Sequence, residues 1–402
     1  MANAFTVSQL VAAKSQDILK GQIVAGNLFN NDIEQNFGKN PKTGNTVKVN
    51  RRPVLTPTER TLGANVNIQD IDETVDSFIL EKELETTITI DPYDLTLSVD
   101  GGEIMSADRI RSFMDNQVSR IVSPVAIGFA EKLDANILAK VDDVPSAYPT
   151  TASLALPSTL SDFNAISTVL NKKKVPMSGR FGIVTPDLYG SMLDLLTKVN
   201  ESGNSDALRN GIVGRLATFD VFMDQHFPED IHTTGIMGTA VVNNVGGYPA
   251  GTTSIAFDTG DQAVGTFLTG DTLTIAGYGN VIVAADVTAV ANAGVVTIKE
   301  PLRETIVDDA AITNYGVAGG VSITYKTVGF FGVRDCIAYA SIPPVVQGEN
   351  FDSTSFSDDG FGVTNTIRGD SGNLNTLWTM NTIPGYKMLD GRLGVKVVQK
   401  LS

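Results

Sequence analysis

The clearest pattern in the chain is an alternation of apolar and polar residues between positions 78 and 90. One face collects the apolar side chains Phe78, Leu80, Leu84, Ile88 and Ile90, and the other collects Glu81, Glu83, Glu85, Thr87 and Thr89. A period of two predicts a β-strand with one buried and one solvated face. Shorter alternations at 47–49 and 66–68 predict a partner strand, so residues 46–100 are expected to form a long antiparallel ribbon. Such a ribbon is marginal alone in water and needs a surface to lie on.

Helical spacing follows the ribbon. Between residues 106 and 141, apolar side chains recur at steps of three and four, at Ile110, Met114, Val118, Ile121, Val125, Phe129, Leu133, Ile137 and Val141. This spacing predicts one long helix that begins at an N-cap, Ser106, and kinks at Pro124. A weaker helical spacing at residues 7–19 lies within a segment, 1–45, that we expect to form an extended arm.

Two further helices are predicted around a short buried strand. Ser161 is the expected N-cap of a helix through Leu170, and lysines at 172–174 suit its negative C-terminal end. The strand covers residues 181–184. Thr185 and Pro186 then give a strong helix start, with the threonine as N-cap and the proline as first helical residue.

Residues 229–324 have a different character. Glycine, threonine and valine are frequent there, and short strands are predicted at 254–257, 272–276, 280–283 and 295–299. Turn signals at 269–271 and 293–294 separate them, which predicts a small all-β module. Strand patterns return at 325–342 and in pieces from 360 to 401.

Composition narrows the function. The 402 residues carry a formal net charge of −15, with one cysteine and two histidines. The charge has the wrong sign for a sequence-independent DNA-binding protein. A lone Cys336 excludes a disulfide within the chain. No apolar run reaches membrane-spanning length, and the first residues lack the features of a signal peptide, so we expect a soluble protein that is not exported.

Few residues suggest chemistry. Asp258-Thr259-Gly260 follows a strand as in an aspartic protease, but that reaction needs a second such carboxylate, so a turn is favoured. Residues 224–232 place His226 and His232 among carboxylates; a metal site is conceivable there, and a polar connection at a module boundary is the favoured interpretation. Residues 277–279 suit a hairpin turn, 172–174 a solvated helix end, and both Trp378 and Cys336 a buried core. We predict no catalytic, cofactor-binding or metal-binding residue.

One stretch resembles a known family. Val175-Pro176-Met177-Ser178-Gly179-Arg180 precedes the strand at 181–184, and Leu208-Arg209-Asn210-Gly211-Ile212-Val213-Gly214-Arg215-Leu216-Ala217-Thr218-Phe219-Asp220-Val221 follows downstream. Together they are similar to the axial-domain segment of major capsid proteins of tailed double-stranded DNA phages, the Hong Kong ninety-seven type. The order of elements agrees: arm, extended loop, spine helix, then interleaved domains.

The resemblance implies an α+β fold with five parts: an N-terminal arm at 1–45, an extended β loop at 46–100, a spine helix with peripheral and axial core at 101–228, an inserted β domain at 229–324, and return strands at 325–402. The inserted part resembles the immunoglobulin-like domain of short-tailed phage coat proteins. The family resemblance also implies a non-enzymatic shell protein of the virion capsid, assembled in the host cytoplasm as hexamers and pentamers around double-stranded DNA. A separate scaffolding protein and a portal are the implied partners, and no membrane or cofactor is involved.

Candidate intersubunit contacts follow from charge. Arginines in the loop face an acidic chain, which indicates ion pairs between subunits near the ribbon. The predicted contact residues are Arg51, Arg52, Glu59, Arg60, Glu81, Glu83 and Glu85. Two alternatives remain open: an encapsulin-like compartment that encloses enzymes, and a β-rich surface-layer protein or adhesin.

Overall fold

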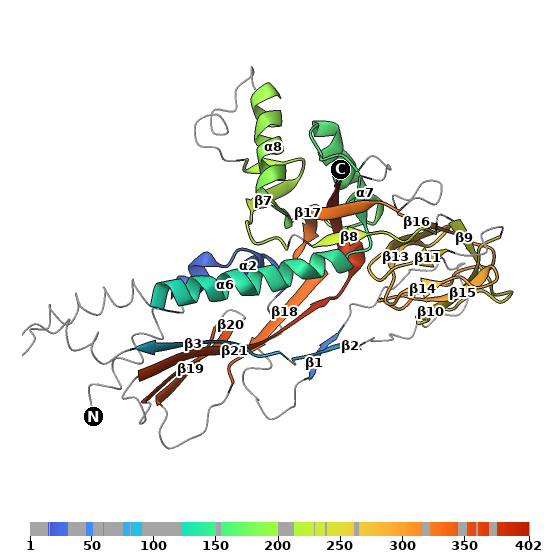
Figure 1. The fold of residues 1–402 in the computed structure, drawn as a ribbon. Helices are drawn as coiled ribbons and strands as arrows, with labels where there is room; N and C mark the ends of the chain where they lie inside the picture. Colours follow the sequence, from blue (N-terminus) through green and yellow to red (C-terminus); the bar gives the residue numbers. More distant parts are fainter. Residues whose placement is uncertain are drawn as a thin grey trace, which may run out of the picture. The chain divides into compact units, whose positions relative to one another are not determined.

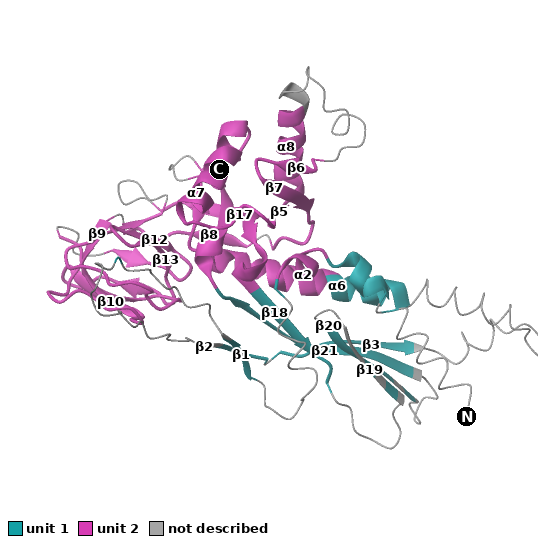
Figure 2. Cartoon of the chain, turned by 180° about the vertical axis from the view of Figure 1, so that it is seen from behind, with its two compact units in different colours: residues 1–23, 30–130, 338–389 teal, residues 24–29, 131–337, 390–402 magenta. Residues whose placement is uncertain are grey.

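The structure is a computed structural model with an α+β fold in which strands dominate, as predicted. It describes residues 15, 17–30, 46–50, 59, 75–80, 82–90, 122–149, 154–199, 213–228, 230–237, 239–260, 265–315, 322–344, 352–358, 361–369 and 376–401. The chain forms two compact units (Figure 2). Unit 1 comprises residues 1–23, 30–130 and 338–389, and unit 2 comprises 24–29, 131–337 and 390–402.

The base of the predicted ribbon is present in unit 1. Strands β1 (Thr46–Asn50) and β2 (Val75–Ile79) pair antiparallel, with Val47 opposite Phe78. Both side chains are buried in a small apolar cluster that also includes Leu80, Ala338, Ala340 and Leu389. The ribbon therefore lies on an apolar surface, as its marginal stability requires.

The alternation at 78–90 belongs to two strands, and the single strand predicted there is wrong. Strand β2 ends at Ile79, and β3 (Leu84–Ile90) begins five residues later. The two have different partners, because β2 pairs with β1 whereas β3 pairs with β21 (Thr376–Met388). The alternation of exposure itself is confirmed: Glu83, Glu85, Thr87 and Thr89 are exposed, and Leu84 and Ile88 are half-buried.

The main sheet of unit 1 has the strand order β18-β21-β20-β19, with β3 also on β21. Its remaining strands are β18 (Ile337–Ile342), β19 (Asp352–Asp358) and β20 (Phe361–Gly369). Trp378 lies between Ile88 on β3 and Ile367 on β20, and it is buried, as predicted.

Helix α6 (Ser123–Leu138) is the described part of the predicted spine helix, and a 3₁₀ segment (Ala139–Asp143) continues it. Its predicted apolar face is confirmed, because Val125, Phe129, Leu133, Ile137 and Val141 are all buried. The predicted start at Ser106 lies outside the described residues. Pro124 is the second residue of the described helix, so the predicted kink has no described helix before it.

Unit 2 is built on a mixed sheet with the order β4-β22-β17-β5-β7-β6. Strand β8 also pairs with β17, and the two lie side by side in Figure 1. Its strands are β4 (Ala147–Tyr148), β5 (Arg180–Val184), β6 (Arg215–Leu216), β7 (Phe219–Met223), β8 (Ile231–Thr233), β17 (Thr324–Val333) and β22 (Gly394–Lys400). Helices α7 (Leu160–Lys172) and α8 (Pro186–Val199) share one buried apolar cluster with this sheet. The strand predicted at 325–342 is interrupted, because a 3₁₀ turn at Arg334–Cys336 separates β17 in unit 2 from β18.

Two cap predictions need correction. Thr159, and not Ser161, caps α7: its side chain accepts from the Asp162 backbone N–H while the Asp162 carboxylate accepts from the Thr159 N–H. This capping box is readable as Thr-x-x-Asp. Helix α8 begins at Pro186, as predicted, but the Thr185 hydroxyl is buried and has no hydrogen-bond partner among the described residues.

The all-β module in unit 2 has a six-stranded antiparallel sheet, β13-β12-β16-β9-β10-β15, and a two-stranded sheet, β11-β14. The strands are β9 (Thr239–Val242), β10 (Ser254–Asp258), β11 (Thr266–Phe267), β12 (Thr272–Ile275), β13 (Gly279–Ile282), β14 (Val287–Thr288), β15 (Ala293–Thr297) and β16 (Ala311–Asn314). Its buried core draws only on residues between Met237 and Ile312. The turn predicted at 293–294 is wrong; it lies at Ala291 and Asn292, which both have positive φ.

The module leaves and rejoins the mixed sheet at one place. Strand β8 lies at the N-terminal end of the predicted segment 229–324, β17 begins at its C-terminal end, and the two pair with Thr233 opposite Thr324. The Thr234 N–H donates to the Ile323 carbonyl, which extends this pairing by one step. A segment whose two ends lie side by side can be inserted into a sheet without disturbing it.

Candidate assembly surfaces and buried polar clusters

The predicted intersubunit contacts lie partly outside the described residues. Arg51, Arg52, Arg60 and Glu81 are not described, and Glu59 is exposed. Glu83 and Glu85 are exposed at the start of β3. Glu83 Oε1 accepts from Asn381 Nδ2 at 3.1 Å, and Glu85 Oε1 accepts from the Thr87 hydroxyl at 2.7 Å. Glu83 lies just before β3 and Glu85 lies on it, and both exposed carboxylates are held by a surface hydrogen bond while remaining accessible to a partner.

Two strands of the unit 1 sheet have an open edge among the described residues. Strand β3 pairs only with β21, and β19 pairs only with β20. Their other edges carry backbone N–H and C=O groups that no described strand pairs. An open edge of this kind is a template for a strand from another chain.

The motif at 175–180 is structural. The Arg180 side chain is buried, and it donates to the Pro176 carbonyl at 2.8 Å, the Val175 carbonyl at 2.6 Å and Asn171 Oδ1 at 2.8 Å. Gly179 has φ +72°, which allows the chain to turn back over this side chain. The arginine thereby fixes the connection between α7 and β5.

The other sequence motifs form turns, a helix end and part of the buried core. Asp258-Thr259-Gly260 ends β10, with Gly260 at φ +58°, so the favoured turn is confirmed. Residues 277–279 form the β12–β13 hairpin. Lys172 and Lys174 are exposed, but Lys173 is half-buried and donates to the Ser146 hydroxyl. Cys336 is a buried free thiol, and burial raises its pKa.

The two histidines separate into different clusters, although they lie six residues apart. His232 Nε2 is 2.9 Å from Oδ1 of Asp271, a fully buried carboxylate. The second oxygen of Asp271 accepts from Leu268 N, Gly235 N and Asn314 Nδ2 at 2.8, 3.0 and 3.0 Å. This cluster has every carboxylate oxygen bonded and holds the connection between β8 and the module.

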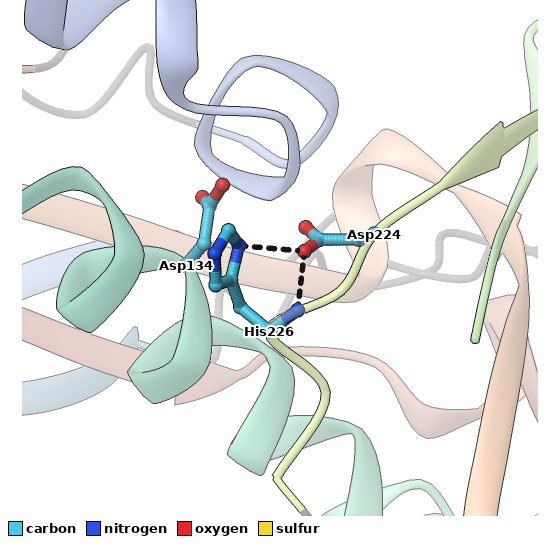
Figure 3. Close-up of side chains that lie close together, drawn as sticks. All are labelled: Asp134, Asp224 and His226. Atoms are coloured by element: carbon cyan, nitrogen blue, oxygen red, sulfur yellow. Dashed lines mark hydrogen bonds and ion pairs between the residues drawn. The ribbon is translucent and has the colours of Figure 1, made fainter. Parts of the chain in front are cut away.

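His226 lies with two buried aspartates from distant parts of the sequence (Figure 3). Its Nδ1 is 3.0 Å from Oδ1 of Asp224, which also accepts from the His226 backbone N–H at 2.8 Å. Asp134 on α6 accepts from the backbone N–H groups of Val24 at 2.7 Å and Gly26 at 3.1 Å. Burial raises the pKa of Asp134 to about 6, the charge of Asp224 adds to this, and the backbone hydrogen bonds oppose it.

Sequence reasoning missed this cluster because Asp134 is about ninety positions from the other two residues. One ligand atom from each of Asp134, Asp224 and His226 lies within 4.8 Å of the others. Nothing local marks Asp134, which appears in the sequence as one more polar position of an amphipathic helix. Within the described residues, no helix has the length and apolar character needed to cross a membrane.

Comparison with known proteins gives the family. The model of a family described as phage capsid protein matches residues 83–293, which is just over half of the chain. The search of curated proteins gives no match. The chain therefore belongs to the phage capsid protein family. Its function is that of a structural major capsid protein, and its place is the capsid of the virion.

Solved structures of phage particles are similar at low identity. A chain of Mycobacterium phage Che8 has 14% identity and a TM-score of 0.46, over 93% of this chain and 90% of that one. A chain from the capsid structure of cyanophage P-SCSP1u has 11% identity and a TM-score of 0.43, over 90% and 85%. A chain from the mature capsid of bacteriophage PhiM1 has 10% identity and a TM-score of 0.40, over 88% of this chain and 82% of that one. The family assignment rests on the family model and not on these scores.

Proposed function

We propose that this capsid protein assembles into hexamers and pentamers of a closed icosahedral shell, with the Hong Kong ninety-seven type of subunit. The observation that carries the proposal is the family match together with the open edges of β3 and β19 in unit 1. Identical subunits with unpaired strand edges gain backbone hydrogen bonds only when another copy supplies the missing strand. In a closed shell every subunit has neighbours that can pair with these strand edges.

Charge fixes the register of neighbours in this proposal. The exposed carboxylates of Glu83 and Glu85 would face Arg51, Arg52 and Arg60 of the loop at 46–100 in an adjacent subunit. Ion pairs at the rim of an interface select orientation more than they add affinity. The net charge of −15 suits a shell that encloses double-stranded DNA without binding it, because a chain with excess acidic residues offers few cations to neutralise phosphates. Non-enzymatic action, assembly in the host cytoplasm, and a separate scaffolding protein and portal belong to the same proposal.

The β module, residues 229–324, is proposed to be an inserted domain that stabilises the subunit. Its own buried core and the adjacent ends at β8 and β17 support this. If it is autonomous, the isolated segment 229–324 melts cooperatively in calorimetry. A featureless melt of that segment would contradict the assignment.

Electron microscopy of the overexpressed full-length protein, with and without the phage's scaffolding protein, tests the assembly. We expect closed shells. A variant that lacks residues 57–63 of the loop should give soluble subunits that assemble poorly, and normal shells from it would contradict the role of the loop. Particle contents separate the alternatives: DNA in particles from infected cells supports a genome shell, and a protein cargo supports an encapsulin-like compartment.

A further inference from the structure

One cluster in unit 2 carries negative charge that the described residues do not neutralise. Asp134 and Asp224 are buried, with exposed fractions of 0% and 2%. Among the described residues, no lysine or arginine forms an ion pair with either carboxylate, and the half-buried His226 is the single group there that can carry positive charge. A buried carboxylate without a neutralising partner destabilises a fold strongly, so proteins normally pair it with a cation or a metal ion.

One atom of the cluster lacks any partner. Oδ2 of Asp224 is buried and has no hydrogen-bond partner among the described residues, whereas Oδ1 accepts from the His226 ring and backbone. Figure 3 shows this second oxygen on the side of Asp224 that faces Asp134. A buried carboxylate oxygen without a donor is rare in folded proteins, and a bound ion is one of its regular explanations.

We propose that Asp134, Asp224 and His226 form a binding site for a divalent transition-metal ion of the zinc or manganese type. Two carboxylates and an imidazole are a mixed oxygen and nitrogen set, which suits these ions better than calcium or magnesium. Ligands at about 2 Å from a tetrahedral zinc ion lie about 3.3 Å apart, so small side-chain rotations close the site from its present 4.8 Å span. Solvent would supply the remaining ligand.

The surroundings of His226 fit this role. Its Nδ1 faces Asp224, and its other ring nitrogen, Nε2, lies 3.7 Å from Oε1 of Glu131. Metal-bound histidines commonly donate their second N–H to a carboxylate, which fixes the ring. The ion would replace the hydrogen now shared by Nδ1 and Asp224. Because Asp134 also holds Val24 and Gly26, the ion would fasten three distant segments of unit 2: the N-terminal segment, α6 and the chain after β7.

Equilibrium dialysis of the full-length protein, stripped with chelator and titrated with zinc chloride or manganese chloride, tests the site by elemental analysis. We expect one ion per chain. Asp224→Asn and His226→Gln should each weaken binding by about tenfold or more. The matched controls are Asp220→Asn, an exposed carboxylate on β7, and His232→Gln, which removes the only other histidine. Both controls should bind as the wild type does.

X-ray absorption at the zinc edge decides the matter without a variant. The proposal requires oxygen and imidazole nitrogen neighbours and no sulfur, which separates this site from the lone thiol of Cys336. The inference is overturned by a zinc–sulfur distance, by the absence of binding at about 0.1 mM free metal, or by equal binding in the wild type and both site variants. None of these results bears on shell formation, so the two proposals fail separately.

Discussion

Nε2 of His232 and Oδ1 of Asp271 lie 2.9 Å apart, and this contact joins strand β8 to the residue that precedes β12 of the module. A carboxylate only accepts hydrogen bonds, so the imidazole donates. Asp271 also accepts from Gly235 on the connecting segment and from Asn314 at the end of β16. One buried side chain thus ties the start of the module to the mixed sheet of unit 2.

Replacing Asp271 with alanine should therefore destabilise unit 2. The change leaves two buried donors, at Gly235 and Asn314, and a half-buried donor at Leu268 without an acceptor, and each buried unsatisfied donor costs about 1–3 kcal/mol. We expect the free energy of unfolding to fall by about 3 kcal/mol or more, measured by urea denaturation. The control is Asp258→Ala, whose carboxylate makes an exposed bond to Asn243 and should cost less than about 1 kcal/mol. Equal losses would contradict the importance of the Asp271 cluster.

Arg180 gives a second stability prediction. Arg180→Ala removes a buried guanidinium that satisfies the Val175 and Pro176 carbonyls and Asn171. Loss of these charged hydrogen bonds, with the cavity that remains, should cost about 3 kcal/mol in unfolding free energy. Arg215→Ala is the matched control, because that side chain is 66% exposed and its ion pair with Asp220, at 3.8 Å, lies on the surface. Its loss should change the free energy of unfolding by less than about 0.5 kcal/mol. A small effect at Arg180 would show that water replaces its bonds.

Two glycine substitutions compare a tightly packed position, under the β1–β2 ribbon, with an open one. A Cβ at Gly385 on β21 would lie 2.2 Å from Leu80 Cδ2 and 2.9 Å from the Phe78 ring. Gly385→Ala must push these side chains out of the cluster under β2, and such overpacking costs about 1–3 kcal/mol. Gly128 on α6 has open space around its Cβ position. Gly128→Ala should stabilise by about 0.5–1 kcal/mol, because alanine favours helix. Thermal melts of both variants, shifted in opposite directions, would agree with this account.

These residues also show what the sequence could predict. The start of α8 at Pro186, the hairpin at 277–279 and the buried face of α6 follow from local signals, and all three are confirmed. The break between β2 and β3 does not follow, because alternation reports burial and is silent on which strand is the partner. A strand that continues the pattern on a new neighbour appears in the sequence as one strand.

The polar clusters were harder still. Asp271 and His232 are separated by 39 positions, and Asp134 by still more from His226, so only the folded chain brings them together. The sequence did show two histidines among carboxylates at 224–232. It could not show that His232 contacts a carboxylate whose two oxygens are both hydrogen-bonded. Nor could it show that His226 contacts a carboxylate with one oxygen that has no partner among the described residues.

Acid should weaken unit 2 through Asp390. Burial by itself would raise the pKa of this carboxyl. The hydrogen bonds from Arg392 and the charge of Arg303, 3.0 Å away, lower the pKa by more than burial raises it, so the net pKa lies below its usual value. A carboxylate with a lowered folded-state pKa stabilises the fold above the unfolded-state pKa of about 3.9, and that stabilisation is lost as the pH falls through the lower folded-state value. Asp390→Asn should therefore be less stable than the wild type at pH 7, with a gap that narrows below about pH 4. Urea denaturation at both pH values measures the gap, and a constant gap would contradict the prediction.

The acidic row on β3 gives the prediction closest to function. Glu83→Lys and Glu85→Lys together place two positive charges where the proposal needs two negative ones to meet the arginines of a neighbouring loop. Both side chains are exposed and their hydrogen bonds are on the surface, so the subunit should keep its fold and its melting temperature. Assembly should fail or give irregular particles in electron microscopy, because like charges face each other across the interface. Asp230→Lys with Glu304→Lys makes the same change in net charge at exposed positions of unit 2 and should assemble normally. If both pairs block assembly, the cause is net charge; if neither does, β3 takes no part in the contact. Rescue of the β3 variant by Arg51→Glu and Arg52→Glu in the same chain would identify the partner residues.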